Sequence, residues 1–149
     1  MVLISHRGNI SGRNLEKENR PDYIKEAIEE GYNVEVDTWL FRKNFYLGHD
    51  KPTYKVSHQF FYTNNSKMWI HAKNMEALEK LHHVTNCFFH DKDQAVLTSR
   101  NKIWVYPGQP LVEDCVALIF DTTTDYPMNK LRKCYALCTD NVLYWKKKI

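Results

Sequence analysis

Short apolar runs that end in polar residues recur along this chain of 149 residues, and they constrain its fold more than any other feature. Each run has the length of a β-strand, and two helical patterns separate the first few of them. Strands that alternate with helices favour parallel βαβ units. The carboxyl ends of parallel strands meet at one edge of the sheet, where functional side chains gather. The polar residues expected at that edge are His6, Asp37, His71 or Lys73, His90, Asp121 and Asp140.

The expected elements follow from the spacing of apolar residues and from the turn residues between them. Pro21 suits the first turn of a helix over residues 21–30, and Asn74 can cap a helix that runs to about residue 82. A further short helix fits residues 128–134. Residues 51–66 are polar and aromatic without a clear period, so we expect a long loop there. The expected strands are residues 2–5, 33–40, 45–47, 68–72, 87–89, 95–98, 103–106, 117–120 and 136–139.

The length of the chain limits the fold class. A complete (β/α)₈ barrel of the TIM type typically takes about 250 residues, whereas this chain has 149. We therefore expect one α/β domain over residues 1–149, built as a reduced or incomplete TIM-type (β/α) barrel. Several helices, above all those after residue 82, should be shortened or missing.

Composition is that of an ordinary globular chain. Hydrophobic residues make up 43% and charged residues 26% of the sequence, and the net charge is +3. The basic residues are scattered, which argues against nucleic acid, although a mild positive bias suits an anionic substrate. We find no signal peptide and no stretch that could span a bilayer, so we expect a cytoplasmic protein without stable membrane insertion. The four cysteines form no CxxC pair and are expected to be reduced, buried thiols.

Glu35 and Asp37 form the first candidate site. Their i, i+2 spacing puts both carboxylates on one face of one strand, while Val34 and Val36 face the other way. Two adjacent carboxylates repel each other unless a cation lies between them, and oxygen ligands of this kind suit Mg²⁺ or Ca²⁺. A solvated strand face explains the same pair without a metal.

His6, Arg7 and Gly8 stand together at the end of the first strand. Arg7 can offer a bidentate fork to phosphate oxygens, and His6 can transfer a proton near neutral pH. An exposed pair on a capped turn is the alternative interpretation. His49 follows a later strand, where Asp50 can orient or charge its ring; a plain turn is equally consistent.

These motifs occur in a set order within the first fifty residues. The order is His6-Arg7-Gly8, Glu18-Asn19, Glu35-x-Asp37 and Gly48-His49-Asp50. It resembles the N-terminal signature of the glycerophosphodiester phosphodiesterases, whose wider superfamily includes phosphatidylinositol-specific phospholipase C and related phospholipase D toxins. Further along, His71-Ala72-Lys73 resembles the family's E-x-K strand and Thr139-Asp140-Asn141 its last-strand TD. The likeness is specific over residues 3–50 and thin beyond them.

The resemblance implies an enzyme, a metal-dependent phosphoric diester hydrolase that acts on a small glycerol- or sugar-linked phosphodiester. Glu35 and Asp37 would bind a divalent cation. His6 and His49 would act as the acid and base pair, in either order.

The resemblance also assigns residues around the phosphate. Arg7 and Lys73 would hold it and offset the charge that builds on its oxygens. Glu18 would be a further site residue near the metal or His6. His90 stands at the end of its own strand and is a candidate for the lining of the same site.

His71 departs from the family pattern, which has a glutamate as the third protein ligand of the metal. Imidazole suits Mn²⁺ or Zn²⁺ better than Mg²⁺ or Ca²⁺. The expected cofactor is therefore a divalent ion. The two carboxylates favour Mg²⁺ or Ca²⁺, whereas the imidazole of His71 favours Mn²⁺ or Zn²⁺. Weak metal binding or another role for His71 is the alternative, and it supports a second hypothesis, a catalytically inactive phosphate- or metal-binding module on the same fold. Nothing in the sequence indicates an oligomeric state.

Overall fold

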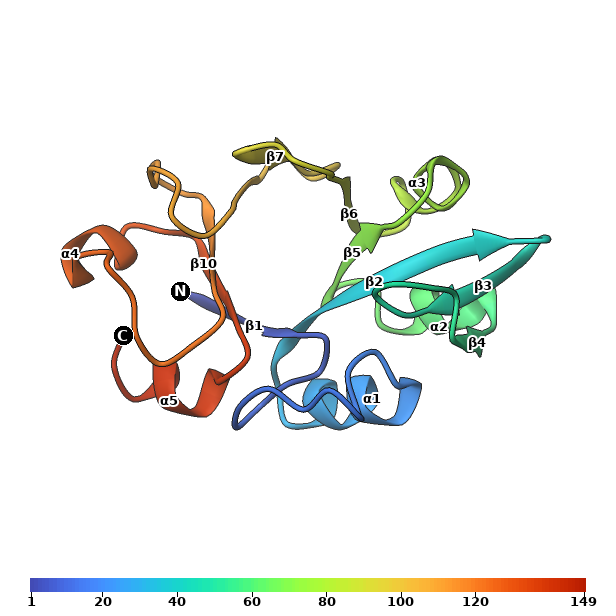
Figure 1. The fold of residues 1–149 in the computed structure, drawn as a ribbon, viewed down its shortest axis with the longest axis horizontal. Coiled ribbons are helices and arrows are strands. Elements are labelled where there is room, and N and C mark those ends of the chain that lie inside the picture. The colour runs from blue at the N-terminus through green and yellow to red at the C-terminus, as the bar shows by residue number, and fades with distance from the viewer.

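A computed structural model describes all 149 residues of the chain. Ten strands form one curled, mixed sheet, and five short helices lie on its outer side (Figure 1). The strands are β1 (Val2–His6), β2 (Asn33–Phe41), β3 (Asn44–Leu47), β4 (Tyr54–Val56), β5 (Met68–Ala72), β6 (Asn86–Phe89), β7 (Ala95–Leu97), β8 (Ile103–Val105), β9 (Val116–Ile119) and β10 (Ala136–Thr139). The helices are α1 (Pro21–Glu29), α2 (His58–Thr63), α3 (Met75–Leu81), α4 (Met128–Leu131) and α5 (Val142–Lys146).

Strand β2 is the branch point of the sheet. Its first residues pair in parallel with β1 on one side, its middle pairs in parallel with β5 on the other, and its last four residues pair antiparallel with β3. Beyond β1 the parallel neighbours are β10, β9 and β8, and β6 follows β5. The registers set His6 opposite Glu35 and Asp37 opposite His71, which brings the polar ends of three strands together.

The expectation of a TIM-type (β/α) barrel is wrong. The sheet is strand-rich and mixed, it curls into a half-barrel, and its helices have only four to nine residues. Residues 90–94 join β6 to β7 and residues 106–115 join β8 to β9, and neither connection contains a helix. A parallel crossover with a helix takes a dozen or more residues, so these segments are too short for one. The hairpin of β7 and β8 takes the place of a βαβ unit.

The two edges of the curl at β6 and β7 are not paired as strands. They meet instead through isolated hydrogen bonds just after β7. The backbone N–H of Ser99 donates to the carbonyl of Cys87 at 2.9 Å, and the Thr98 hydroxyl donates to the side-chain oxygen of Asn86 at 3.1 Å. The sheet therefore curls toward closure without becoming a continuous ring of strands.

The prediction of a long loop over residues 51–66 is also wrong, because this segment contains β4 and α2. Phe60 and Phe61 of α2 are buried in the core, with exposed fractions of 9% and 0%. Their burial stabilises a helix of six residues that has no periodic pattern of its own. The three helices predicted from the sequence are present as α1, α3 and α4, although α4 is shorter than predicted. Helix α5 was not predicted.

The alternation of side chains along β2 separates two buried layers. Val34 and Val36 are fully buried in a cluster of 18 residues that includes side chains of α1, α2 and α3. A second cluster lies on the other face, where Trp69, Phe88 and Trp104 pack inside the curl. Glu35 and Asp37 face the same side as this second cluster. The inner face of the curled sheet is thus apolar along the strands and polar where the strands end, at their carboxyl termini.

All four cysteines are free in this structure and buried, which confirms the expected burial; they are Cys87, Cys115, Cys134 and Cys138. None of the five helices combines the length and the apolar character needed to cross a membrane.

Candidate functional site

The site begins where β1 ends, at His6, Arg7 and Gly8. The backbone N–H of Arg7 donates to the carbonyl of Glu35 at 3.0 Å, and the φ of 53° at Arg7 turns the chain out of the strand. Gly8 has a φ of 90°, and a Cβ at this position would lie 2.8 Å from Cδ1 of Tyr23. Both the backbone conformation and the packing against α1 therefore favour glycine. The turn presents His6 and Arg7 at the carboxyl edge of the sheet.

His6 is buried between two carboxylates. Its Nδ1 lies 2.7 Å from Oδ1 of Asp140, just after β10, and its Nε2 lies 3.8 Å from Oε2 of Glu35. Burial by itself would lower the pKa of His6, but the hydrogen bond to Asp140 and the charges of Glu35 and Asp140 outweigh it and raise the pKa above its ordinary value. His6 can therefore carry a proton near neutral pH.

Glu35, Asp37 and His71 form a group that can hold a metal ion. One ligand atom from each residue lies within 4.8 Å of the others. Nδ1 of His71 lies 3.2 Å from Oδ1 of Asp37 and 3.9 Å from Oε1 of Glu35. Three atoms of the group are buried without a hydrogen-bond partner, namely Oε2 of Glu35, Oδ1 of Asp37 and Nε2 of His71. Buried polar atoms are normally satisfied, so the two unpaired carboxylate oxygens fit a cation held near Nδ1 of His71.

Burial and local charge drive the pKa values of the two carboxyl groups apart. Burial and the charge of Asp37 raise the pKa of Glu35. Burial also acts to raise the pKa of Asp37, but close contact with His71 and the charges of Arg7 and Lys73 outweigh it, and this pKa lies well below its usual range. Asp37 is therefore the permanent anion of the site, while ionised Glu35 depends more on a nearby cation.

Two cationic side chains, Arg7 and Lys73, flank Asp37. Nε of Arg7 lies 2.8 Å from Oδ2 of Asp37, and Nζ of Lys73 lies 3.5 Å from Oδ1. Nη1 of Arg7 also donates to Oε2 of Glu18 at 3.2 Å. All three predicted side chains, Arg7, Lys73 and Glu18, therefore lie around the candidate metal group.

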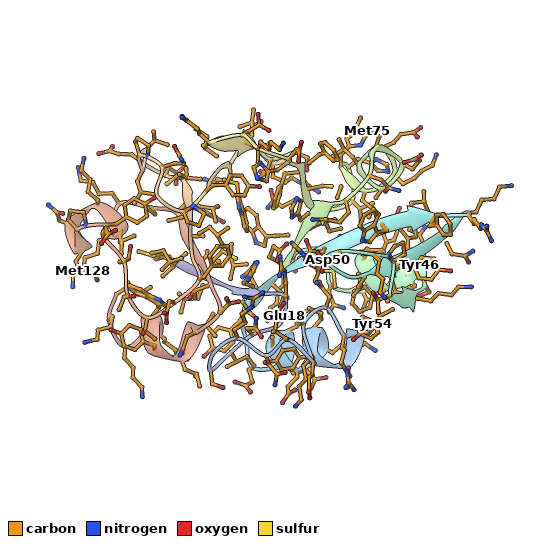
Figure 2. The ribbon with its side chains drawn as sticks, in the orientation of Figure 1. Glu18, Tyr46, Asp50, Tyr54, Met75 and Met128 are labelled. Carbon is orange, nitrogen blue, oxygen red and sulfur yellow. The ribbon has the colours of Figure 1, made fainter.

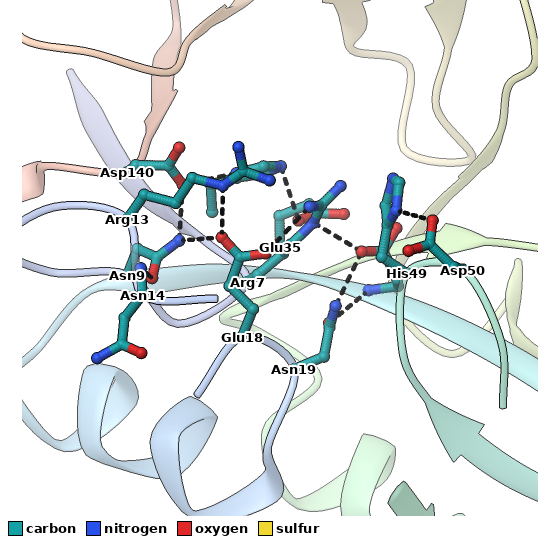
Figure 3. A network of polar contacts seen from close by, with 12 residues as sticks. Arg7, Asn9, Arg13, Asn14, Glu18, Asn19, Glu35, His49, Asp50 and Asp140 are labelled. Atoms are coloured by element: carbon teal, nitrogen blue, oxygen red, sulfur yellow. Dashed lines mark hydrogen bonds and ion pairs between the residues drawn. The ribbon is translucent and has the colours of Figure 1, made fainter. Parts of the chain in front are cut away.

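Four further side chains, to which the sequence analysis gave no role in the site, join this network (Figure 3): Asn9, Arg13, Asn19 and Asp140, of which Asp140 was expected at this edge of the sheet. Asn19 clamps Asp37, because its Nδ2 donates to Oδ2 at 2.9 Å and its Oδ1 accepts from the backbone N–H at 3.0 Å. Asn9 donates to Glu18 at 3.0 Å and to Asp140 at 2.7 Å. Asn19 and Asp140 stood in motifs that the sequence analysis had singled out, whereas no sequence pattern marked Asn9.

His49 lies at the edge of the site and outside the buried network. Its side chain is 46% exposed, and its Nδ1 lies 2.7 Å from Oδ1 of the exposed Asp50. The loop that carries it is anchored to β2, because the backbone N–H of Gly48 donates to the carbonyl of Asp37 at 3.1 Å. This anchor sets His49 on the wall of a cavity that His6 also lines.

Two cavities, an inner and an outer chamber, share His6, Arg7, His49 and Phe120 in their walls. The inner chamber has a volume of about 270 Å³, and its other lining residues include Glu35, His71, Lys73, His90 and Tyr106. The outer chamber has a volume of about 520 Å³, and Arg13, Asp121 and Asp140 are among its other lining residues.

Figure 2 shows Glu18 and Asp50 toward the middle of the molecule, and Met75 and Met128 at its periphery.

His90 and Tyr106 form an aromatic wall of the inner chamber. Their rings stack with centroids 3.4 Å apart and planes 19° apart, and the His90 ring lies 6.1 Å from that of His71. Burial and the charge of His71 lower the pKa of His90. Burial and the charges of Glu35 and Asp37 raise the pKa of Tyr106. Both side chains are therefore uncharged near neutral pH.

The predicted site residues thus gather at one edge of the curl. The metal group, the two cations and His6 are in contact there, while His49 and His90 line the chambers next to them. No protein-family model and no curated protein matches this chain.

Proposed function

We propose that this chain is a metal-dependent phosphodiesterase of the glycerophosphodiester phosphodiesterase type, which hydrolyses a small glycerol- or sugar-linked phosphodiester. One observation carries the proposal. The Glu35–Asp37–His71 group, which can hold a metal ion, lies within 4 Å of both the His6 ring and the Arg7 guanidinium, and all but Asp37 line the inner chamber. Hydrolysis of a phosphodiester draws on a cation, a group that moves a proton, and cationic donors for the phosphate oxygens.

Glu35, Asp37 and His71 would hold the cation. When bound, a divalent ion polarises the phosphate and helps to orient the nucleophile. The two carboxylates suit Mg²⁺ or Ca²⁺, whereas the imidazole of His71 suits Mn²⁺ or Zn²⁺. We expect the imidazole of His71 to shift the metal-ion preference of the site toward Mn²⁺ or Zn²⁺.

Arg7 and Lys73 would bind the phosphate. Both lie against Asp37, and both can turn toward an anionic substrate once the charge of that carboxylate is shared with another cation. The guanidinium of Arg7 also contacts Glu18, which limits its movement and keeps its fork at the edge of the chamber.

His6 would exchange its proton through Nε2, because Nδ1 is engaged by Asp140. Water or a substrate hydroxyl attacks phosphorus, and its proton passes to one of the two histidines, His6 or His49. The bond from phosphorus to the leaving alcohol breaks, and the other histidine protonates that oxygen. Both histidines line both chambers, so they can act on the two ester oxygens of one phosphate.

A catalytically inactive module that binds phosphate or metal is the second candidate. His49 favours it, because its side chain is 46% exposed and pairs with Asp50 instead of a group of the buried network. The imidazole of His71 in place of a third carboxylate favours it as well. Such a module would keep the metal group and Arg7 and lack turnover.

Hydrolysis of bis(p-nitrophenyl) phosphate and of glycerophosphodiesters, measured with Mg²⁺, Ca²⁺, Mn²⁺ and Zn²⁺ in turn, separates these two candidates. We expect hydrolysis that EDTA abolishes and that the Glu35→Gln/Asp37→Asn double variant lacks. Glu113→Gln, which changes an exposed carboxylate paired with Lys133, is the matched control and should keep full activity. Hydrolysis in EDTA would contradict the role of the metal. A protein that binds metal and phosphate in calorimetry, yet hydrolyses nothing, would be the inactive module.

A further inference from the structure

Tyr106 and His90 carry polar atoms that the protein leaves unpaired. The hydroxyl of Tyr106 and Nδ1 of His90 are both buried, and neither has a hydrogen-bond partner. A carboxylate oxygen of Asp93 lies 3.8 Å from Nδ1 of His90, which is beyond hydrogen-bond reach. A buried polar atom without a partner is destabilising, so a ligand that supplies the partner gains affinity.

The metal group does not account for these two atoms. The cluster that can hold an ion consists of Glu35, Asp37 and His71, and its unpaired carboxylate oxygens fit that role. Tyr106 and His90 stack on each other beside it, and both line the inner chamber. They are therefore placed to contact the substrate next to the phosphate.

The aromatic side of the inner chamber suits a small, uncharged group. Its volume of about 270 Å³ is slightly below the range of typical ligand pockets, about 300–1,000 Å³, so the chamber accommodates only a small group. Phe88 and Trp104, stacked with centroids 4.5 Å apart, supply apolar surface at the same chamber. Aromatic walls with a few polar atoms bind a ligand by its apolar faces and fix its orientation by hydrogen bonds.

We propose that Tyr106 and His90 form a subsite for a hydroxyl-bearing alcohol group of the substrate and set the specificity of the site. This inference rests on the proposed phosphodiesterase function, because it assigns one ester group of that substrate to the inner chamber. The other ester group then lies in the outer chamber, which is about 520 Å³ in volume and accommodates a larger substituent. The phosphate lies between them, at the His6 and Arg7 side chains that line both chambers, and Lys73 reaches it from the wall of the inner chamber.

Binding of two phosphate monoesters tests the subsite without requiring turnover. Glycerol 1-phosphate and propyl phosphate share a three-carbon chain and differ in two hydroxyls. We expect the metal-loaded protein to bind glycerol 1-phosphate about tenfold more tightly in calorimetry, as one or two hydrogen bonds to the ligand would give. Tyr106→Phe removes one hydroxyl from the protein and should bring the two affinities close together. His90→Phe, which keeps the stacked ring, should do the same.

Tyr126→Phe is the matched control. The Tyr126 hydroxyl already donates to the carbonyl of Gln109 at 2.6 Å, and Tyr126 is absent from the walls of both chambers. This variant should keep the preference for glycerol 1-phosphate. Equal affinities for the two monoesters in the parent protein, or an unchanged preference in Tyr106→Phe, would overturn the subsite.

Turnover separates a failure of the subsite from a failure of the proposed function. A protein that hydrolyses aryl esters of glycerol phosphate and of propyl phosphate with equal kcat/KM would remain a phosphodiesterase and would lack the subsite. A protein that prefers glycerol 1-phosphate in binding, but hydrolyses no phosphodiester with any of the four ions, would retain the subsite and would not be the proposed enzyme.

Discussion

Nδ1 of His6 lies 2.7 Å from Oδ1 of Asp140, although 134 positions separate the two residues in the sequence. The parallel pairing of β1 with β10 creates this contact at the carboxyl ends of the two strands. Asn9 donates to the same carboxylate oxygen at 2.7 Å and so fixes its position. Asp140 therefore sets the orientation of the His6 ring and leaves Nε2 as the atom that can exchange a proton.

Asp140→Asn should lower the pKa of His6, because an amide keeps the shape of the carboxylate and removes its charge. NMR titration of the His6 ring in the metal-free protein measures this pKa directly. Asp50→Asn is the matched control, since it changes the carboxylate beside His49 and should leave His6 unaffected. If the phosphodiesterase proposal holds, turnover should fall by on the order of tenfold or more in Asp140→Asn. An unchanged pKa of His6 would show that Asp140 does not control its proton.

The stability that His6 contributes to the metal-free protein should fall as the pH rises through neutrality, and the difference between the parent and Asp140→Asn isolates this contribution from those of other titrating groups. The folded-state pKa of His6 is raised, so its contribution is fully present below the ordinary histidine pKa and is lost as the pH rises through the folded value. Burial and the Asp37 charge raise the pKa of Glu35, which acts in the same direction. Urea unfolding in EDTA between about pH 6 and about pH 8.5 measures the effect. The excess stability of the parent over Asp140→Asn should shrink as the pH rises over this range; a difference that does not change with pH would contradict the assignment.

His71→Glu should shift metal preference toward Mg²⁺ or Ca²⁺, because a hard oxygen ligand replaces an imidazole. We expect the ratio of Mn²⁺ to Mg²⁺ affinity to fall by on the order of tenfold in competition calorimetry. Glu35→Gln with Asp37→Asn should abolish binding of both ions. His82→Glu, which adds a carboxylate at an exposed histidine at the end of α3, is the control for charge alone. A double variant that binds metal as well as the parent would make the carboxylate pair structural.

Gly8→Ala should lower the free energy of unfolding by more than Gly31→Ala does. Both glycines have positive φ values, 90° at Gly8 and 97° at Gly31, so both variants carry a backbone cost of about 1–2 kcal/mol. Only at Gly8 would the new Cβ meet a neighbour, Cδ1 of Tyr23 at 2.8 Å, whereas nothing lies within 4 Å at Gly31. Urea unfolding of the two variants measures the difference. Equal losses would mean that the Tyr23 ring moves aside without cost.

Local sequence patterns predicted the parts of the site that depend on one strand at a time. The i, i+2 spacing of Glu35 and Asp37 placed both carboxylates on the face of β2 opposite Val34 and Val36, and the structure confirms this arrangement. The predictions of the strand that ends at His6 and of the helix capped by Asn74 also rested on local patterns and are confirmed. The contact of His6 with Asp140 was not accessible in this way, because it depends on which distant strand pairs with β1.

The fold class was mispredicted for a related reason. Strand endings and early alternation indicate parallel pairing, and β1, β2, β5 and β6 do pair in parallel. Residues 95–105, however, form an antiparallel hairpin, and residues 54–63 form β4 and α2. Both structures depend on tertiary packing, above all on the burial of Phe61, and no periodic pattern of apolar residues in these segments predicts them.

Replacing His6 or His49 by alanine should each cost on the order of 10²-fold or more in turnover, if the two act as an acid and base pair. The pH dependence of kcat should be bell-shaped in the parent protein and should lose one limb in each variant. His82→Ala is the matched control, because His82 is an exposed histidine at the end of α3 and should leave the rate unchanged. His6 is buried against Asp140 and Glu35 while His49 is half exposed, so thermal melting must show that His6→Ala still folds. Full activity in both variants would refute the acid–base mechanism. Loss in His6→Ala alone would leave His6 as the one proton carrier and would assign the second proton transfer to water at the open side of the outer chamber.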